Sequence, residues 1–173
     1  LRGFVHRDLK LSNVLLRPKQ EAIFLNDFEL AVEVGQKLPC SGGTSAYRSP
    51  EGVEGNVASC ALDIYAIGAM VAHIALGFDP CRYRISAEKL IDIVAINGYL
   101  NAEKFIRRCM LLDNQNRFSS VSEIKVELEK IDLWRKEETS LGITNFLFSK
   151  PLDKSKIKNY IWQTVKYIEQ FKE

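Results

Sequence analysis

The spacing of hydrophobic residues divides the chain into an irregular first third and a helical remainder. Two short apolar runs at 14–16 and 23–25 flank the polar stretch 17–22, a pattern that predicts an antiparallel hairpin. Residues 34–55 are rich in Gly, Ser and Pro and show no period. We therefore expect an irregular segment there, of the kind that often carries binding residues.

Helical periodicity predicts the rest of the fold. Residues 63–76 are apolar on nearly every face, which is typical of a helix buried inside a helical domain. The next two predicted helices open on the capping residues Ser86 and Asn101, and Ser120 with Glu123 matches a capping box. The further predicted helices cover residues 86–96, 101–112, 121–134 and 153–172. The sequence thus predicts a mainly α fold with one small β-hairpin.

Composition and charge narrow the class of protein. A chain of 173 residues that is 46% hydrophobic can bury one sizeable core, and a net charge of +2 gives no indication of a nucleic-acid partner. The most apolar run, 64–76, is too short to cross a bilayer and is followed by Gly77, so we expect a buried helix and no membrane partner. His73 within it is expected to be a satisfied core histidine rather than a ligand.

The four cysteines form no C-x-x-C pair and have no histidines clustered with them. This spacing is not that of a zinc site. We expect reduced thiols in an intracellular, cytoplasmic protein.

Polar residues suited to phosphate chemistry gather at 6–13, with the sequence HRDLKLSN. Phosphoryl transfer needs a carboxylate that orients the attacking hydroxyl, a cation on the transferring phosphate, and oxygen ligands for magnesium. Asp8, Lys10 and Asn13 supply these three types of group. A further carboxylate, Asp27, follows fourteen residues after Asn13 at the end of an apolar strand.

The pattern H-R-D-x-K-x-x-N, followed by D-F-E, resembles the C-terminal lobe of eukaryotic protein kinases. The resemblance implies that Asp8 is the catalytic base and that Lys10 contacts the γ-phosphate of ATP. It also implies that Asn13 and Asp27 are ligands of Mg²⁺ and contact the bound nucleotide. A lysine two residues after the Asp is similar to serine/threonine kinases, so the implied substrate is a protein Ser or Thr hydroxyl.

The sequence GTSAYRSPE at 43–51 is similar to the end of the family's activation segment. The resemblance implies that Thr44 lies near Asp8 and shapes the site for a Ser or Thr substrate. It also makes Arg7 a candidate regulatory residue that could bind a phosphorylated Ser41.

Two later motifs extend the resemblance. Asp63, in DIYAIG, is implied to accept backbone hydrogen bonds from the catalytic loop, and Arg117, in DNQNR, is implied to form a partly buried pair with Glu51. We therefore assign residues 1–131 to a kinase C-terminal lobe. Residues 132–173 are predicted to form a helical extension whose role the sequence does not indicate.

Two departures from the family pattern bear on activity. None of the ten glycines forms the G-x-G-x-x-G loop of the small β-rich lobe, and no strand lysine precedes the catalytic loop. Glu29 replaces the glycine of D-F-G, where a side chain restricts the backbone and a carboxylate repels nearby phosphates. We expect a partial catalytic domain that needs a small lobe, supplied by sequence upstream of Leu1 or by a partner.

Two alternatives stay open. A catalytically inactive, pseudokinase-like module that binds a protein is compatible with the missing lobe and with Glu29. A small-molecule phosphotransferase of kinase-like fold would share the same acidic core, but the peptide-binding segment 43–51 argues against it.

Overall fold

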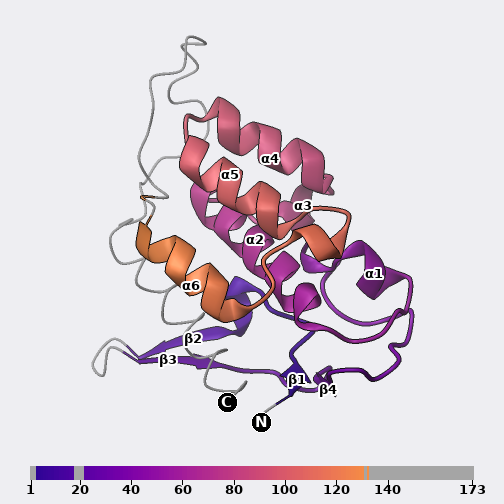
Figure 1. Ribbon diagram of the computed structural model, residues 1–173. Helices are drawn as coiled ribbons and strands as arrows, with labels where there is room; N and C mark the ends of the chain where they lie inside the picture. The colour runs from indigo at the N-terminus through magenta and orange to yellow at the C-terminus, as the bar shows by residue number, and fades with distance from the viewer. Residues whose placement is uncertain (1–2, 18–21, 131, 133–173) are drawn as a thin grey trace.

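The computed structural model describes residues 3–17, 22–130 and 132, and it shows a mainly helical fold with two small antiparallel β pairs (Figure 1). The strands are β1 (Phe4–Val5), β2 (Val14–Arg17), β3 (Ala22–Leu25) and β4 (Val32–Glu33). The α-helices are α1 (Pro50–Val53), α2 (Cys60–Leu76), α3 (Pro80–Tyr83), α4 (Ala87–Ile96), α5 (Leu100–Cys109) and α6 (Val121–Lys130). Short 3-10 turns are η1 (Leu11–Asn13), η3 (Ser45–Tyr47) and η4 (Asn114–Asn116).

The predicted hairpin is present as β2 and β3, which pair antiparallel from Val14 opposite Leu25. A second pair, β1 with β4, was not predicted, because two-residue strands carry no measurable period. In this second pair Val5 lies opposite Val32, and just beyond it the N–H of Val34 donates to the carbonyl of Gly3 over 2.7 Å. These two β pairs flank residues 6–13, hereafter the HRD loop, on both sides.

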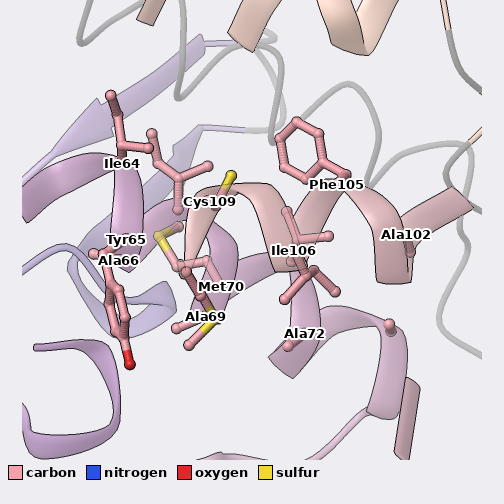
Figure 2. Close-up of a cluster of buried hydrophobic side chains, with 14 of the residues drawn as sticks. Ile64, Tyr65, Ala66, Ala69, Met70, Ala72, Ala102, Phe105, Ile106 and Cys109 are labelled. Atoms are coloured by element: carbon pink, nitrogen blue, oxygen red, sulfur yellow. The ribbon is translucent and has the colours of Figure 1, made fainter. Parts of the chain in front are cut away.

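Helix α2 forms the centre of the hydrophobic core, as its apolar sequence predicted. It buries residues on nearly all faces and ends at Gly77, whose φ of 73° is the left-handed conformation that glycine adopts most readily. Figure 2 shows side chains of α2 and α5 in one buried cluster, among them Met70 from α2 and Cys109 from α5. A Cβ at Gly68 would lie 2.6 Å from the Cβ of Cys109, so the two helices approach this closely only with glycine there.

The helix starts test the capping predictions. Ser86 caps α4 as predicted, with its Oγ accepting the N–H of Lys89 over 3.4 Å. The prediction for Asn101 is wrong, because α5 begins one residue earlier and Tyr99 occupies the N-cap position. The side-chain amide of Asn101 instead donates to the carbonyl of Asp132 over 3.0 Å, so tertiary contacts have overridden its capping preference.

Half of the predicted capping box is present at α6. The N–H of Glu123 donates to Ser120 Oγ over 3.1 Å, but the Glu123 carboxylate accepts the N–H of Ser119, at 2.7 Å, one residue earlier than the box requires. Glu123 also pairs with Arg108, which ties α6 to α5. Helix α6 ends at Lys130, and Asp132, within the predicted continuation to 134, is not helical. The other residues of that continuation and the predicted helix 153–172 lie outside those described.

Residues 34–55 are mostly irregular, as predicted, with η3 and α1 as short interruptions. A single antiparallel bridge joins Lys37 to Val57 within this part of the fold. All four cysteines are free thiols, and only Cys109 is buried. Within the described ranges no helix combines the length and the apolar character that crossing a membrane requires.

Candidate active site

Helix α2 holds the backbone of the HRD loop in place. The buried carboxylate of Asp63 accepts the N–H of His6 at Oδ2 over 2.9 Å and the N–H of Arg7 at Oδ1 over 3.0 Å. Arg7 has a φ of 69°, an uncommon conformation for a side-chain-bearing residue that persists only where its surroundings fix it. The contact implied for Asp63 is therefore present, and it supports a strained turn just before Asp8.

The carboxylate of Asp8 receives four hydrogen bonds. Oδ1 accepts the N–H of Thr44 over 2.9 Å and its hydroxyl over 2.7 Å. Oδ2 accepts the ammonium of Lys10 over 2.6 Å and the side-chain amide of Asn13 over 3.3 Å. Three other residues that were singled out from the sequence thus meet at the carboxylate of Asp8, a residue that is 7% exposed.

These donors decide the charge of Asp8. Burial raises the pKa of a carboxyl group, but the hydrogen bonds from Lys10 and Thr44, with the charge of Lys10, outweigh it. The pKa of Asp8 therefore lies below its usual value, and the group is ionised at neutral pH. An ionised carboxylate can accept a hydrogen bond from a hydroxyl and orient it for reaction.

Lys10 bridges the two sides of the site. Its ammonium donates to Asp8 and, over 2.9 Å, to Thr44 Oγ1, while about a quarter of its side chain (24%) is exposed. The approach of Thr44 depends on the preceding Gly43, which has a φ of 78° and whose Cβ would lie 2.8 Å from the carbonyl oxygen of Arg7. A side chain at position 43 would collide with the backbone of Arg7, which explains why glycine precedes Thr44.

A backbone hydrogen bond joins the segment that contains Asn13 to the segment that contains Asp27. The N–H of Asn26 donates to the carbonyl of Asn13 over 2.9 Å, which brings the D-F-E sequence beside the HRD loop. Asp27 is exposed and has a φ of 65°, which Asp tolerates better than most residues. In the described part of the chain no hydrogen bond joins the side chain of Asn13 to that of Asp27.

The side chains fit a magnesium ion in their chemistry. Asn13 commits its amide Nδ2 to Asp8, through the carbonyl at 2.9 Å and through Oδ2, so its own Oδ1 remains for a cation. Asp27 offers an exposed carboxylate. Mg²⁺ is usually bound by one or two such oxygens together with substrate phosphates. Within the described ranges no three His, Cys, Asp or Glu cluster into a metal site of their own.

The D-F-E segment packs against the HRD loop through Phe28. Its ring lies 4.8 Å from the ring of His6, centroid to centroid, and His6 Nε2 is 3.0 Å from the carbonyl of Asn26. Glu29 is exposed and is not among the residues with positive φ. The backbone at Glu29, the position of the usual glycine, therefore does not adopt the left-handed conformation, and the positive φ falls on Asp27.

Glu51 and Arg117 form the implied ion pair. Arg117 Nη1 and Nη2 donate to the two carboxylate oxygens over 2.6 and 3.0 Å, and the guanidinium also donates to the carbonyls of Leu111 and Ala61. Its Cζ lies 5.1 Å from the ring centroid of Tyr65. The pair fixes α1, just after the Thr44 segment, to the helical core.

Two further contacts concern the segment before α1. Arg7 donates to the carbonyls of Leu30, over 3.4 Å, and Ser41, over 3.1 Å, so it contacts the backbone of Ser41 rather than its hydroxyl. A contact that the sequence did not predict joins Tyr47 to His73, with 2.5 Å between the hydroxyl oxygen and Nδ1. His73 is half-buried and bonded, in agreement with the expectation of a satisfied histidine.

The chain is similar in sequence to known protein kinases. The chain is 30% identical over 158 residues to the serine/threonine-protein kinase PknD of Chlamydia pneumoniae, an alignment that covers 74% of this chain and 17% of that protein. It is 40% identical over 82 residues to calcium/calmodulin-dependent protein kinase type II of Caenorhabditis elegans, covering 45% of this chain and 11% of that protein. The chain thus spans less than a fifth of the length of either relative.

A solved structure has the same fold. The kinase PK-1 of the Cydia pomonella granulovirus superposes with a TM-score of 0.54 and 24% identity, over 71% of this chain and 52% of that one. The family model described as protein kinase domain matches residues 1–128, which include every residue of the site. The chain therefore belongs to the protein kinase family.

Proposed function

We propose that the chain is the C-terminal lobe of a protein serine/threonine kinase, which transfers the γ-phosphate of ATP to a protein Ser or Thr hydroxyl. The observation that carries the proposal is the convergence of Lys10, Asn13 and Thr44 on the ionised carboxylate of Asp8. A chance loop would not bring these groups, which are up to 36 residues apart, onto one buried side chain.

Each side chain has a definite role in the proposed reaction. Asp8 orients the substrate hydroxyl and takes its proton as the phosphate is transferred. Lys10 lies beside Asp8 with part of its side chain open, so it can contact the transferring phosphate and offset its charge. Asn13 and Asp27 would hold Mg²⁺ against the ATP phosphates. When bound, the ion would neutralise negative charge that develops during transfer.

The proposal requires a small lobe in addition to this chain. The sequence contains no glycine-rich loop, and in protein kinases that loop covers the ATP phosphates. Two large hydrophobic side chains near the site are open to solvent: Leu15 on β2 is 47% exposed and Phe28 is 36% exposed. We propose that a small lobe, supplied upstream of Leu1 or by a partner, covers this side, with residues 1–131 acting as the catalytic lobe.

A second candidate is a kinase-like module that binds a protein without transferring phosphate. The exposed carboxylate of Glu29, two residues after Asp27, favours it, because negative charge beside bound phosphates opposes their binding. The intact set of donors on Asp8 favours the enzyme. Nucleotide binding distinguishes the two.

The test is a thermal-shift measurement with Mg-ATP, on a protein in which a kinase small lobe precedes Leu1. The enzyme predicts stabilisation that corresponds to about 2.7 kcal/mol when the nucleotide is at about a hundred times its dissociation constant. Asp27→Ala should abolish most of it, while Asp92→Ala, a change to an exposed acid on α4, should leave it intact. No stabilisation, or stabilisation that Asp27→Ala does not reduce, supports the binding module instead.

A further inference from the structure

The hydroxyl of Tyr47 lies between two side chains from other elements. His73, in the last turn of α2, is 2.5 Å away at Nδ1, and Asp79, the N-cap of α3, is 3.5 Å away at Oδ1. Asp79 Oδ1 also accepts the N–H of Cys81 over 3.0 Å. Tyr47 is 4% exposed, and no step of the proposed reaction uses any of these side chains.

The protons of this cluster are assigned here from its heavy-atom distances. Burial, together with the negative charge of Asp79, raises the pKa of Tyr47 well above its usual range, so the phenol always has a proton to donate. The phenol has one proton for two neighbours, His73 Nδ1 at 2.5 Å and Asp79 Oδ1 at 3.5 Å, and we assign it to the nearer one, which makes His73 Nδ1 the acceptor. His73 must therefore be neutral, with its proton on Nε2, for this bond to exist.

Tyr47 is connected directly to the active site. It closes the turn η3, whose N-cap is Thr44, and its N–H donates to the carbonyl of Thr44 over 2.9 Å. Fixing the Tyr47 hydroxyl therefore fixes the turn that presents the N–H and hydroxyl of Thr44 to Asp8.

Helix α2 holds both sides of the contact between Asp8 and Thr44. Asp63, near its N-terminus, binds the backbone of the HRD loop, and His73, ten residues later, binds the turn that carries Thr44. A rigid helix spans about 15 Å over ten residues, so it fixes the distance between these two anchors. The first anchor was implied by the sequence motif, and the second was not.

We propose that neutral His73 is a positioning residue, which holds Thr44 on Asp8 by accepting the hydroxyl of Tyr47, and that protonation of His73 releases this contact. The inference rests on the proposed function only in that it assumes phosphate transfer uses the contact between Thr44 and Asp8. The contact itself can be measured without any catalysis.

The direction of the pH dependence follows from the groups around the ring. Burial lowers the pKa of His73, the charge of Asp79 raises it, and the charge of Arg82 on α3 lowers it, which leaves it below the ordinary value of 6.5. Tyr47 keeps its proton at these pH values, because its pKa is raised. The ring is therefore neutral at about pH 7 and the contact is complete; as the pH falls through the lowered pKa, Nδ1 takes up a proton and can no longer accept.

The test is amide hydrogen exchange, followed by NMR in the 173-residue chain, with the Thr44 amide as the reporter and the Ile106 amide in α5 as the control for global opening. His73→Asn keeps an acceptor at the position of Nδ1 but cannot ionise, and His73→Leu removes the acceptor. At about pH 7, His73→Leu should speed Thr44 exchange about five- to tenfold relative to Ile106, the change expected from one hydrogen bond. His73→Asn should match the wild type.

On lowering the pH to about 5, Thr44 in the wild type should lose protection, after correction for intrinsic exchange, whereas His73→Asn should not. A pH effect of the same size in His73→Asn would come from a group other than His73 and overturns the proposal. Tyr47→Phe removes the donor with little change of volume and should speed Thr44 exchange as much as His73→Leu does. It replaces His73→Leu in the test if that variant does not fold. Unchanged Thr44 protection in Tyr47→Phe also overturns it. None of these readouts requires phosphate transfer, so they can fail while the proposed function stands.

Discussion

Thr44 donates twice to the same oxygen of Asp8, through its backbone N–H over 2.9 Å and its hydroxyl over 2.7 Å. The two residues are 36 positions apart, and each is anchored separately to α2, Asp8 through the backbone of its own loop and Thr44 through its turn. The contact therefore reports whether the Thr44 segment is in place over the HRD loop. It also contributes to the charge state of the group that we propose as the base.

Removal of the Thr44 hydroxyl should raise the pKa of Asp8. The hydroxyl stabilises the ionised carboxylate, so Thr44→Val, which preserves shape but not the donor, brings the pKa of Asp8 up towards its usual value. Thr44→Ser keeps the donor and should leave the pKa as it is. A carbon-13 NMR titration of the Asp8 carboxyl measures both, and an equal pKa in wild type and Thr44→Val would show that the hydroxyl has no part in setting it.

Breaking the ion pair of Glu51 should destabilise the fold strongly. Glu51→Gln leaves the guanidinium of Arg117, whose side chain is fully buried, without its counter-charge, which typically costs about 3–5 kcal/mol of unfolding free energy. Glu103→Gln is the matched control, because the partner of Glu103 is the half-exposed Arg107, and it should cost less than about 1 kcal/mol. Urea unfolding followed by circular dichroism compares the two, and costs of similar size would contradict the structural role of the Glu51 pair.

Gly68→Ala tests the contact between α2 and α5. Alanine favours helix formation over glycine by about 1 kcal/mol, but the added methyl would overlap Cys109 and Met110. We expect the overlap to dominate, with a net loss of about 1–3 kcal/mol. Lys104→Ala, on the exposed side of α5, should change stability by less than about 0.5 kcal/mol. Urea unfolding followed by circular dichroism measures the stability of both variants. A stabilised Gly68→Ala would mean that α2 and α5 pack less closely than described.

The elements that sequence reasoning predicted best are those with a long or strict period. Seventeen residues of α2 are apolar on almost every face, and the hairpin of β2 and β3 has a polar turn between two apolar runs. The pair of β1 and β4 has two residues in each strand, too few to establish a period. Caps failed where tertiary contacts competed, as at Asn101, whose amide bonds to Asp132 instead.

The contacts of the site also differ in whether the sequence could predict them. Asp8, Lys10, Asn13 and Thr44 could be selected because their motifs are compact and ordered, and the structure brings them together. The bond of Tyr47 to His73 could not be predicted from the sequence. It joins residues 26 positions apart and depends on how η3 lies across the end of α2. A histidine inside an apolar helix gives no sign in the sequence of which side chain it meets. Nor could the sequence predict that Glu29 would avoid the strained backbone that falls on Asp27.

The most direct test of the account is phosphate transfer that depends on Asp8. The protein is prepared with a kinase small lobe ahead of Leu1 and incubated with Mg-ATP labelled at the γ-phosphate and a generic protein acceptor, with Asp8→Asn and Asp92→Ala prepared in parallel. We predict label on acceptor Ser or Thr residues with the wild type and with Asp92→Ala, and a loss of at least about a hundredfold with Asp8→Asn. No transfer by the wild type, or transfer that Asp8→Asn leaves unchanged, would contradict the central claim.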